Sequence, residues 1–167
     1  LVGSEMCIRD RLAPMVEEIF TDLTPLAEKS GITLELAGDG VMTGSDALIY
    51  RMIFNLTENA IKYNRPDGSV QVCITQEPEK LLILVSDTGR GIPEEYQQSI
   101  FQPFFRVDKS RSRTFGGAGL GLALVWEIAA LHGGSVRVAE SSDSGTTIAA
   151  ELPRSGNHAA DPKNEML

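Results

Sequence analysis

The chain has 167 residues, of which 42% are hydrophobic and 23% are charged. This length and composition predict one folded domain with its own core and exclude a chain that is disordered throughout. The formal net charge of −8 disfavours broad binding to nucleic acid, whose phosphate backbone carries charge of the same sign. Cys7 and Cys73 show no pairing pattern, which suits a reducing compartment and excludes a cysteine-rich metal site.

No apolar run reaches the length of about 18 residues that a membrane helix needs, and no signal peptide is evident. We therefore expect a cytoplasmic domain, and a membrane anchor in a longer parent chain is left open. Residues 1–11 (LVGSEMCIRDR) resemble translated adaptor sequence more than a domain start, with a native linker as the alternative. The expected domain is 12–153, followed by a disordered polar tail at 154–167.

The first third of the chain predicts a helix and two strands. Apolar residues recur at helical spacing from Leu12 to Lys29, where Pro25 allows a kink. Alternation of apolar and polar residues from Ile32 to Leu36 predicts a strand, and a short second strand is expected to begin at Val41.

The middle of the chain predicts a second helix and two further strands. Ser45 or Asp46 is suited to cap the helix, whose apolar stripe continues to Ile61. Residues 70–75 and 81–85 are rich in Val, Ile and Leu, as expected for strands of a sheet that helices cover.

A long functional loop is expected at residues 87–117, with a short helix near residues 94–100. Residues 120–131 predict another helix, and residues 135–139 and 146–152 predict the closing strands. This order fits an α+β fold in which about three helices cover one face of a mixed sheet of about five strands.

The second helix carries a polar group of residues on one face. Asn55, Asn59, Lys62 and Tyr63 lie three or four residues apart, so their side chains are neighbours. Amide oxygens can ligate Mg²⁺ alongside phosphates, and a lysine can meet a phosphate as a point charge. Taken alone, such a group of residues is more often a solvated helix face than a ligand site.

A second motif, DTGRGIP, begins at Asp87 directly after an apolar strand. The carboxylate can accept a hydrogen bond from an exocyclic amine such as that of adenine, and Gly89 and Gly91 allow the backbone to approach a ligand. A simple turn is the alternative.

Two further motifs lie in or beside the long loop. The string GGAGLGLA contains Gly117, Gly119 and Gly121 and runs into a helix, whose backbone N–H groups suit an anion. Its spacing is neither that of a Rossmann turn nor that of a P-loop. The string FQPFFR at 101–106 ends in Arg106, which can reach a phosphate, although an apolar satellite cluster also explains its phenylalanines.

These four blocks, in their order along the chain, resemble the catalytic and ATP-binding domain of sensor histidine kinases. The resemblance extends from about Leu12 to Pro153. That domain belongs to a superfamily shared with DNA gyrase, mismatch-repair MutL proteins and a heat-shock chaperone. Asn55 to Tyr63 is similar to the N box of the family, and the later blocks are similar to its D-x-G-x-G, F and G-x-G-L-G-L boxes. The resemblance implies a Bergerat-type two-layer α/β sandwich.

The resemblance also implies roles at the phosphates of MgATP. Asn59 would ligate Mg²⁺, and Asn55 would support the surroundings of the metal and the phosphates. Lys62 and Arg106 would contact phosphates.

For the remaining nucleotide contacts, the resemblance implies that Tyr63 lines the pocket, that Asp87 binds the adenine amine and that Gly89 and Gly91 shape the pocket. Backbone donors to the phosphates would come from a further group of residues: Gly119, Leu120 and Gly121.

The implied activity is transfer of the γ-phosphoryl group of ATP to a histidine on a separate dimerisation domain, with a response regulator downstream. Neither His132 nor His158 lies in the sequence context of a phosphoacceptor. Ala118 and Pro103 stand where the family often has threonine and a basic residue. Related ATPases carry a glutamate base where this chain has Asn55, which disfavours hydrolysis. The alternatives are such an ATPase, a serine kinase of the anti-sigma type, and a nucleotide-sensing module without transfer.

Overall fold

The computed structural model describes residues 7–106 and 121–154 of the chain. Its elements, in chain order, are β1 (Cys7–Arg11), α2 (Leu12–Lys29), β2 (Thr33–Gly38), β3 (Val41–Ser45), α3 (Asp46–Lys62), β4 (Ser69–Gln76), β5 (Lys80–Asp87), η1 (Glu94–Tyr96), η2 (Ser99–Phe101), α5 (Gly121–Leu131), β6 (Ser135–Ser142) and β7 (Gly145–Pro153).

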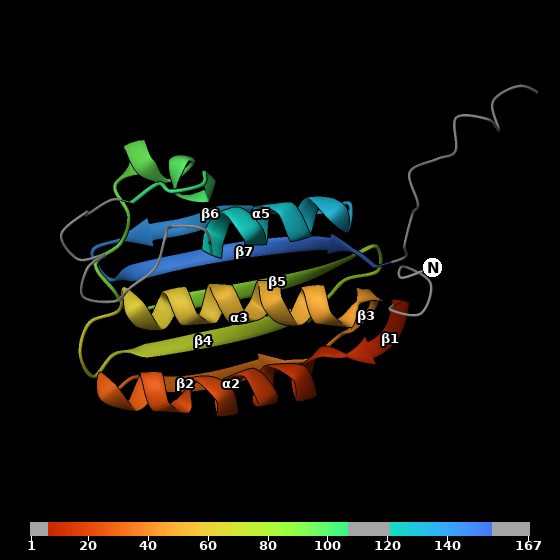
Figure 1. Ribbon diagram of the computed structural model, residues 1–167, viewed down its shortest axis with the longest axis horizontal. Coiled ribbons are helices and arrows are strands. Elements are labelled where there is room, and N and C mark those ends of the chain that lie inside the picture. Colours follow the sequence, from red (N-terminus) through yellow and green to blue (C-terminus); the bar gives the residue numbers. More distant parts are fainter. Residues whose placement is uncertain (1–6, 107–120, 155–167) are drawn as a thin grey trace, which may run out of the picture.

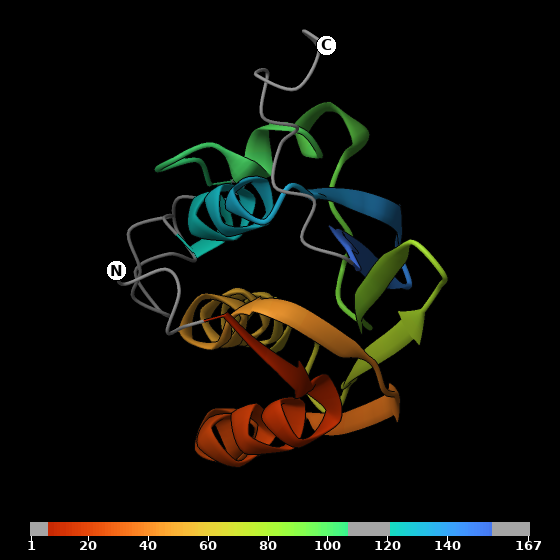
Figure 2. The same ribbon diagram turned by 90° about the vertical axis from the view of Figure 1, so that its right-hand side faces the viewer.

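Five strands form one mixed sheet in the order β2-β4-β5-β7-β6. β2 runs parallel to β4, and the other neighbouring pairs are antiparallel. The helices α2, α3 and α5 lie side by side over one face of this sheet, and the view from the side shows the two layers (Figures 1 and 2). The α+β class, the mixed sheet and the helices on one face are confirmed.

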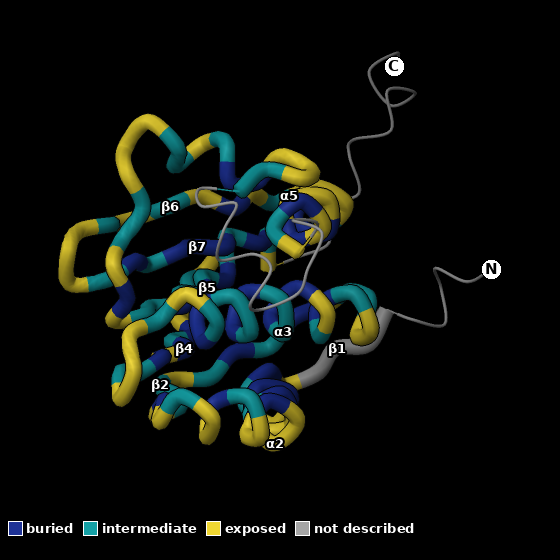
Figure 3. Tube along the Cα trace, turned by 60° about the vertical axis from the view of Figure 1, so that its left-hand side comes forward, coloured by how far each residue is buried: buried dark blue, intermediate teal, exposed yellow. Residues whose placement is uncertain are grey.

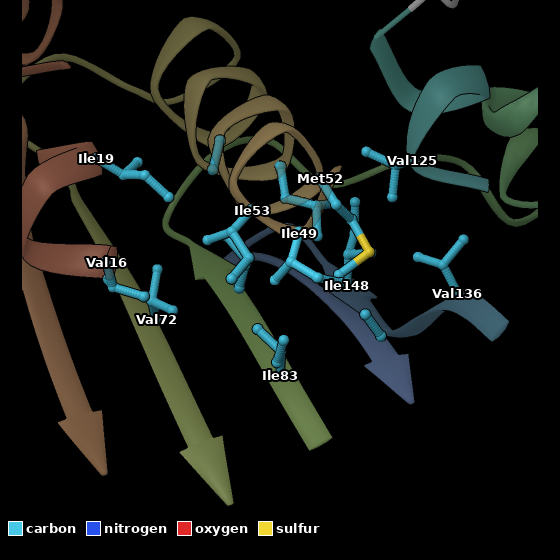
Figure 4. Packing of buried hydrophobic residues seen from close by; sticks show 14 of the residues in the cluster. Val16, Ile19, Ile49, Met52, Ile53, Val72, Ile83, Val125, Val136 and Ile148 are labelled. Atoms are coloured by element: carbon cyan, nitrogen blue, oxygen red, sulfur yellow. The ribbon is translucent and has the colours of Figure 1, made fainter. Parts of the chain in front are cut away.

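The central helix α3 lies over the middle of the sheet. Ser45 caps it, since its side chain accepts the N–H of Leu48 at 3.4 Å. Ile49 and Ile53, one turn apart, point from α3 into the core, where Figure 4 shows them with Ile83 of β5 and Ile148 of β7. In Figure 3 the buried parts of the helices and strands lie between the two layers. This burial holds α3 above the central strands.

The face of the sheet that no helix covers is formed by the alternate residues of each strand, which are less buried. In β5, Leu81, Ile83 and Val85 are buried, whereas Leu82 and Leu84 between them are only half-buried. A strand alternates its side chains between the two faces, so the pattern matches a sheet covered on one side.

α5 is tied to α3 at both ends. At its start, Asn55 Nδ2 donates to the carbonyl of Gly121 at 3.4 Å. At its end, His132 Nε2 accepts the N–H of Ser45 at 3.3 Å, and its Nδ1 lies 2.8 Å from the carbonyl of Ile128. Because Nε2 accepts, the proton of the neutral ring is on Nδ1, which donates to that carbonyl.

The helix predicted from Leu12 to Lys29 is confirmed as α2, which contains Pro25. The structure differs from the sequence-based expectations in two places. Residues 7–11, which we set apart as part of a leader, form β1 and pair antiparallel with β3, so this part of the leader lies against the domain. The origin of residues 1–11 and the disorder of the tail stay predictions. The helix expected near residues 94–100 is instead the two short 3₁₀ turns η1 and η2, anchored by buried Ile100 and Phe101.

No helix in the two described ranges is both long and apolar enough to cross a membrane.

We expect Ile83→Ala to lower the free energy of unfolding by about 2–5 kcal/mol, because it removes a fully buried side chain beneath α3. The matched variant Leu84→Ala, on the half-buried face of the same strand, should cost less than half of that. Urea denaturation followed by circular dichroism measures both, and equal losses would contradict the layer arrangement.

Candidate functional site

Three elements that are distant in sequence carry the residues singled out in three of the four sequence motifs. α3 and β5 both end at the left of Figure 1. α5 begins above the middle of α3, where Asn55 donates to the carbonyl of Gly121.

Asp87 ends β5 with its carboxylate held in one orientation. Its Oδ1 accepts the backbone N–H of Gly89 at 2.9 Å and that of Thr146 at 3.2 Å. In the part of the chain that the structure describes, no hydrogen bond to Oδ2 is found, which leaves this oxygen available to a ligand. Burial raises the pKa of Asp87 above its ordinary value, against the lowering effect of the Gly89 and Thr146 hydrogen bonds.

The loop after Asp87 packs directly against the end of α3. Gly89 is buried, and a Cβ atom at this position would lie 2.6 Å from the carbonyl oxygen of Tyr63. Gly91 has a φ of +81° and approaches the backbone of Ser142 in β6 too closely for any side chain. The close approach that these glycines allow is therefore to the protein itself, and it brings Asp87 beside α3.

The predicted residues of α3 fall on its partly exposed face. Asn55 and Asn59 are half-buried, and the side chain of Tyr63 at the helix end is 46% exposed. Lys62 Nζ forms an ion pair with Glu58 at 3.1 Å, one helical turn away.

Of the string GGAGLGLA and the string FQPFFR, the structure places only a part at the site. Gly121 begins α5 and touches Asn55 through its carbonyl, and among the described residues no atom outside its immediate neighbourhood lies within 4 Å of a Cβ built there. Arg106 is half-buried at the end of the first described range. Gly119 and Leu120 lie outside the described residues, and their predicted contacts to phosphates stay predictions.

Residues that the sequence analysis did not assign to the site also surround Asp87. Thr146 supplies a backbone donor, and its hydroxyl lies 2.9 Å from Ser141 Oγ, which accepts the N–H of Ile92 at 2.7 Å. Asn64 and Thr88 form a second network on the side of β4. The only sequence signals were the Gly145-Thr146 pair before the last strand and the break that Asn64 makes in the helix pattern.

An open cleft of about 1450 Å³ lies between α5, β6 and the η2 turn. Asn55 and Gly121 are part of its lining, whereas Asn59 and Asp87 are not. Its lining is mainly apolar and includes Phe101, Leu124, Trp126 and Val136. This cleft therefore borders the predicted phosphate end of the site and leads away from Asp87.

The fold matches that of known catalytic domains. A solved structure of the mycobacterial sensor histidine kinase MprB superposes with a TM-score of 0.74 at 27% identity, over 87% of this chain and 97% of that chain. The sensor histidine kinase RppB of Synechocystis sp. is 35% identical over 148 residues, which cover 88% of this chain and 32% of that protein. The sensor-like histidine kinase SenX3 of Mycolicibacterium smegmatis is 40% identical over 110 residues, or 66% of this chain and 29% of that protein.

The fold is thus that of histidine kinase catalytic domains. Residues 44–156 match the family described as histidine kinase-, DNA gyrase B-, and HSP90-like ATPase, and the chain belongs to this family. It spans about a third or less of the length of the two curated relatives named above.

We expect Gly89→Ala to lower the free energy of unfolding by about 1–3 kcal/mol, since the added methyl group overlaps the backbone of Tyr63 and must push the loop away from α3. Gly121→Ala is the matched control. The open space around Gly121 and its place in a helix predict unchanged stability or a gain of up to about 1 kcal/mol. Thermal and urea denaturation distinguish the two, and a harmless Gly89→Ala would contradict the close packing.

Proposed function

We propose that this chain is the ATP-binding catalytic domain of a histidine kinase and transfers the γ-phosphoryl group of MgATP to a histidine on a separate dimerisation domain. The observation that carries the proposal is the half-buried carboxylate of Asp87 beside the asparagine-bearing helix: it is fixed through Oδ1 and has no hydrogen bond at Oδ2 from the described residues.

Adenine fits the Asp87 end of the site. Its exocyclic amine is a hydrogen-bond donor, and Oδ2 of Asp87 is an acceptor held in place by the two bonds to Oδ1. Tyr63, with its ring partly exposed at the end of α3, lines the same end. Gly89 and Gly91 shape the pocket by letting the loop pack tightly on α3 and β6.

The phosphates and Mg²⁺ fit the exposed face of α3. No group of three or more His, Cys, Asp and Glu side chains able to hold a metal occurs in the described ranges, so a cation here would rely on nucleotide phosphates and neutral oxygens. The amide oxygen of Asn59 suits Mg²⁺ in this role, with Asn55 beside it. Bound Mg²⁺ would neutralise charge on the triphosphate.

Basic side chains complete the phosphate end. Lys62 is paired with Glu58 in this structure and would direct the same ammonium group to a phosphate. Arg106 stands at the end of the F-box segment. Gly121, together with Gly119 and Leu120 before it in the chain, would offer backbone N–H groups at the start of α5.

Asn55 favours transfer over hydrolysis. It occupies the place of the glutamate base in related ATPases, and a neutral amide does not take a proton from an attacking water. Its Nδ2 instead donates to the carbonyl of Gly121 and so helps to hold α5.

The phosphoacceptor domain would dock on the apolar surface beside the phosphates. Leu124 and Trp126 of α5 are 41% and 51% exposed, and Phe104 is 71% exposed. Trp126 also lies against Phe101, with 5.6 Å between ring centroids, at the wall of the open cleft. A helical domain with an apolar stripe could cover this surface and present its histidine to the γ-phosphate.

Two solved structures of the same fold support the nucleotide and the downstream partner in this proposal. The full-length kinase ShkA was solved in complex with AMPPNP, and the kinase ThkA with its response regulator TrrA. By analogy, we propose a response regulator downstream of this chain and a cytoplasmic location for the domain.

As the pH is lowered, nucleotide affinity should begin to fall at a higher pH than it would if Asp87 had the ordinary pKa of an aspartate. Burial raises the pKa of Asp87, so this carboxyl gains a proton, and loses its charge as an acceptor for the adenine amine, as the pH falls through that raised value. A raised folded-state pKa means that protonation of Asp87 favours the folded chain, so this protonation does not itself cause unfolding. Calorimetric titration with MgATP between pH 7.5 and 4.5 measures the effect.

Asp87→Asn is the control for this titration. It should weaken MgATP binding by about 10- to 100-fold at neutral pH, because an amide N–H then faces the amine. The remaining affinity of this variant should no longer show the part of the pH dependence that comes from protonation of Asp87. Wild-type affinity, or an unchanged pH profile, would count against the assignment.

Phosphoryl transfer is tested by mixing the chain with γ-labelled MgATP and the histidine-bearing dimerisation domain of the same kinase. We expect acid-labile, base-stable label on that domain, abolished by Asn59→Ala. Trp126→Ala should lower the rate of transfer at unchanged nucleotide affinity, since it alters only the docking surface. Acid-stable label, or steady phosphate release that Asn55→Ala abolishes, would instead indicate a serine kinase or an ATPase.

A further inference from the structure

The side chain of Asn64, just past the end of α3, connects three segments of the chain. Its Nδ2 donates to the carbonyl of Ser69 at 2.9 Å, at the start of β4. Its Oδ1 accepts the hydroxyl of Thr88 at 2.8 Å and the backbone N–H of Arg65 at 2.8 Å. The hydroxyl oxygen of Thr88 in turn accepts the N–H of Ser69 at 2.9 Å. Both functional groups of this amide are thus in use.

This network closes the β4–β5 ladder at the point where β5 delivers Asp87. Val70 of β4 pairs with Asp87, so Ser69 and Thr88 are the next residues at that end of the two strands. There the Asn64 amide and the Thr88 hydroxyl join the strands through side chains. The closeness of Gly68 to both side chains leaves no room for a Cβ atom at that position.

The network also determines where one donor to Asp87 points. Thr88 lies between Asp87 and Gly89, and the N–H of Gly89 donates to Oδ1 of Asp87. If Thr88 loses its contact with Asn64, the peptide that carries this N–H loses one of its restraints and keeps the bond of Thr88 to the N–H of Ser69 and the packing of Gly89 on Tyr63. The second donor, Thr146, comes from β7 and is independent of the network.

We propose that Asn64, acting through Thr88, is a positioning residue that sets the selectivity of the site for adenine over guanine. The proposal rests on the proposed function, in which Oδ2 of Asp87 accepts the adenine amine. Guanine presents a carbonyl in the place of that amine, so a rigidly held carboxylate repels it. A carboxylate free to rotate binds adenine less well and rejects guanine less strongly.

The effect is confined to recognition of the base. Among the described residues, no side-chain hydrogen bond or ion pair joins the Asn64 network to the residues that we assign to the metal and the phosphates, Asn55, Asn59 and Lys62. Loosening the network should therefore change the ratio of ATP to GTP affinity and leave affinity for the magnesium complex of inorganic triphosphate unchanged. A purely structural role would lower thermal stability and all three affinities together.

The test measures the binding of MgATP, MgGTP and magnesium triphosphate by calorimetry to the wild-type chain and to Asn64→Ala and Thr88→Val. We expect the ATP-to-GTP affinity ratio to fall by roughly 10-fold in either variant, the size of one lost hydrogen bond. The double variant should be no worse than the more affected single variant, because both changes break the same contact. Should Asn64→Ala not fold, Thr88→Val carries the test alone.

Ser86→Ala is the matched control. Its hydroxyl lies 2.8 Å from that of Thr147 on the open face of the sheet, directly before Asp87 but outside the network, so its removal should leave the ratio unchanged. A ratio that is unchanged in Asn64→Ala and Thr88→Val, or that falls equally in Ser86→Ala, overturns this proposal alone, provided that Asp87→Asn abolishes the preference for ATP. A wild-type chain without such a preference overturns both this proposal and the Asp87 assignment.

Discussion

The burial of α3 against the central strands of the sheet is the constraint on which the site depends. Ile49 and Ile53 fill the space above Ile83 and Ile148, and this packing fixes both the height and the direction of the helix. Because α3 and β5 end at the same side of the molecule, the polar residues of the helix arrive beside the carboxylate that ends the strand. Core packing brings the two halves of the site together, and the hydrogen bond between Asn64 and Thr88 joins them at their ends.

Asp87 shows how a buried carboxylate is tolerated. Burial alone makes its ionised form costly, and two backbone N–H groups from separate segments reduce that cost at one oxygen. The other oxygen keeps its capacity to accept a hydrogen bond. A residue in this state is poorly matched to water and well matched to a ligand with a single donor, which is the physical reason for assigning it to the base of a nucleotide.

Local pattern predicted much of this arrangement. The apolar periods from Leu12 to Lys29 and through α3 placed both helices, and the boxes around Asn59 and Asp87 marked the two segments that pack against each other at Tyr63 and Gly89. Such patterns succeed where one short segment holds the whole signal. The sequence alone did not predict that β5 lies between β4 and β7, since strand order depends on contacts across the chain.

The same limit explains the residues that were missed. Asn64 and Thr88 are 24 positions apart, and their hydrogen bond leaves no periodic trace in the sequence. The pairing of residues 7–11 with β3 depends on backbone groups, so an uncharacteristic side-chain sequence concealed it. The ion pair of Lys62 with Glu58 could have been predicted from their spacing of four residues in a helix, but the family resemblance implied only a contact of Lys62 with phosphate.

The way His132 joins α5 to α3 has a consequence for chemical labelling. Both of its ring nitrogens are engaged, Nε2 by the N–H of Ser45 and Nδ1 by the carbonyl of Ile128. Neither nitrogen has a lone pair free for an electrophile while the two helices stay joined. A reagent such as diethyl pyrocarbonate would therefore acylate this imidazole only after α5 separates from the start of α3. The rate of acylation of His132 would then report how often the two helices separate.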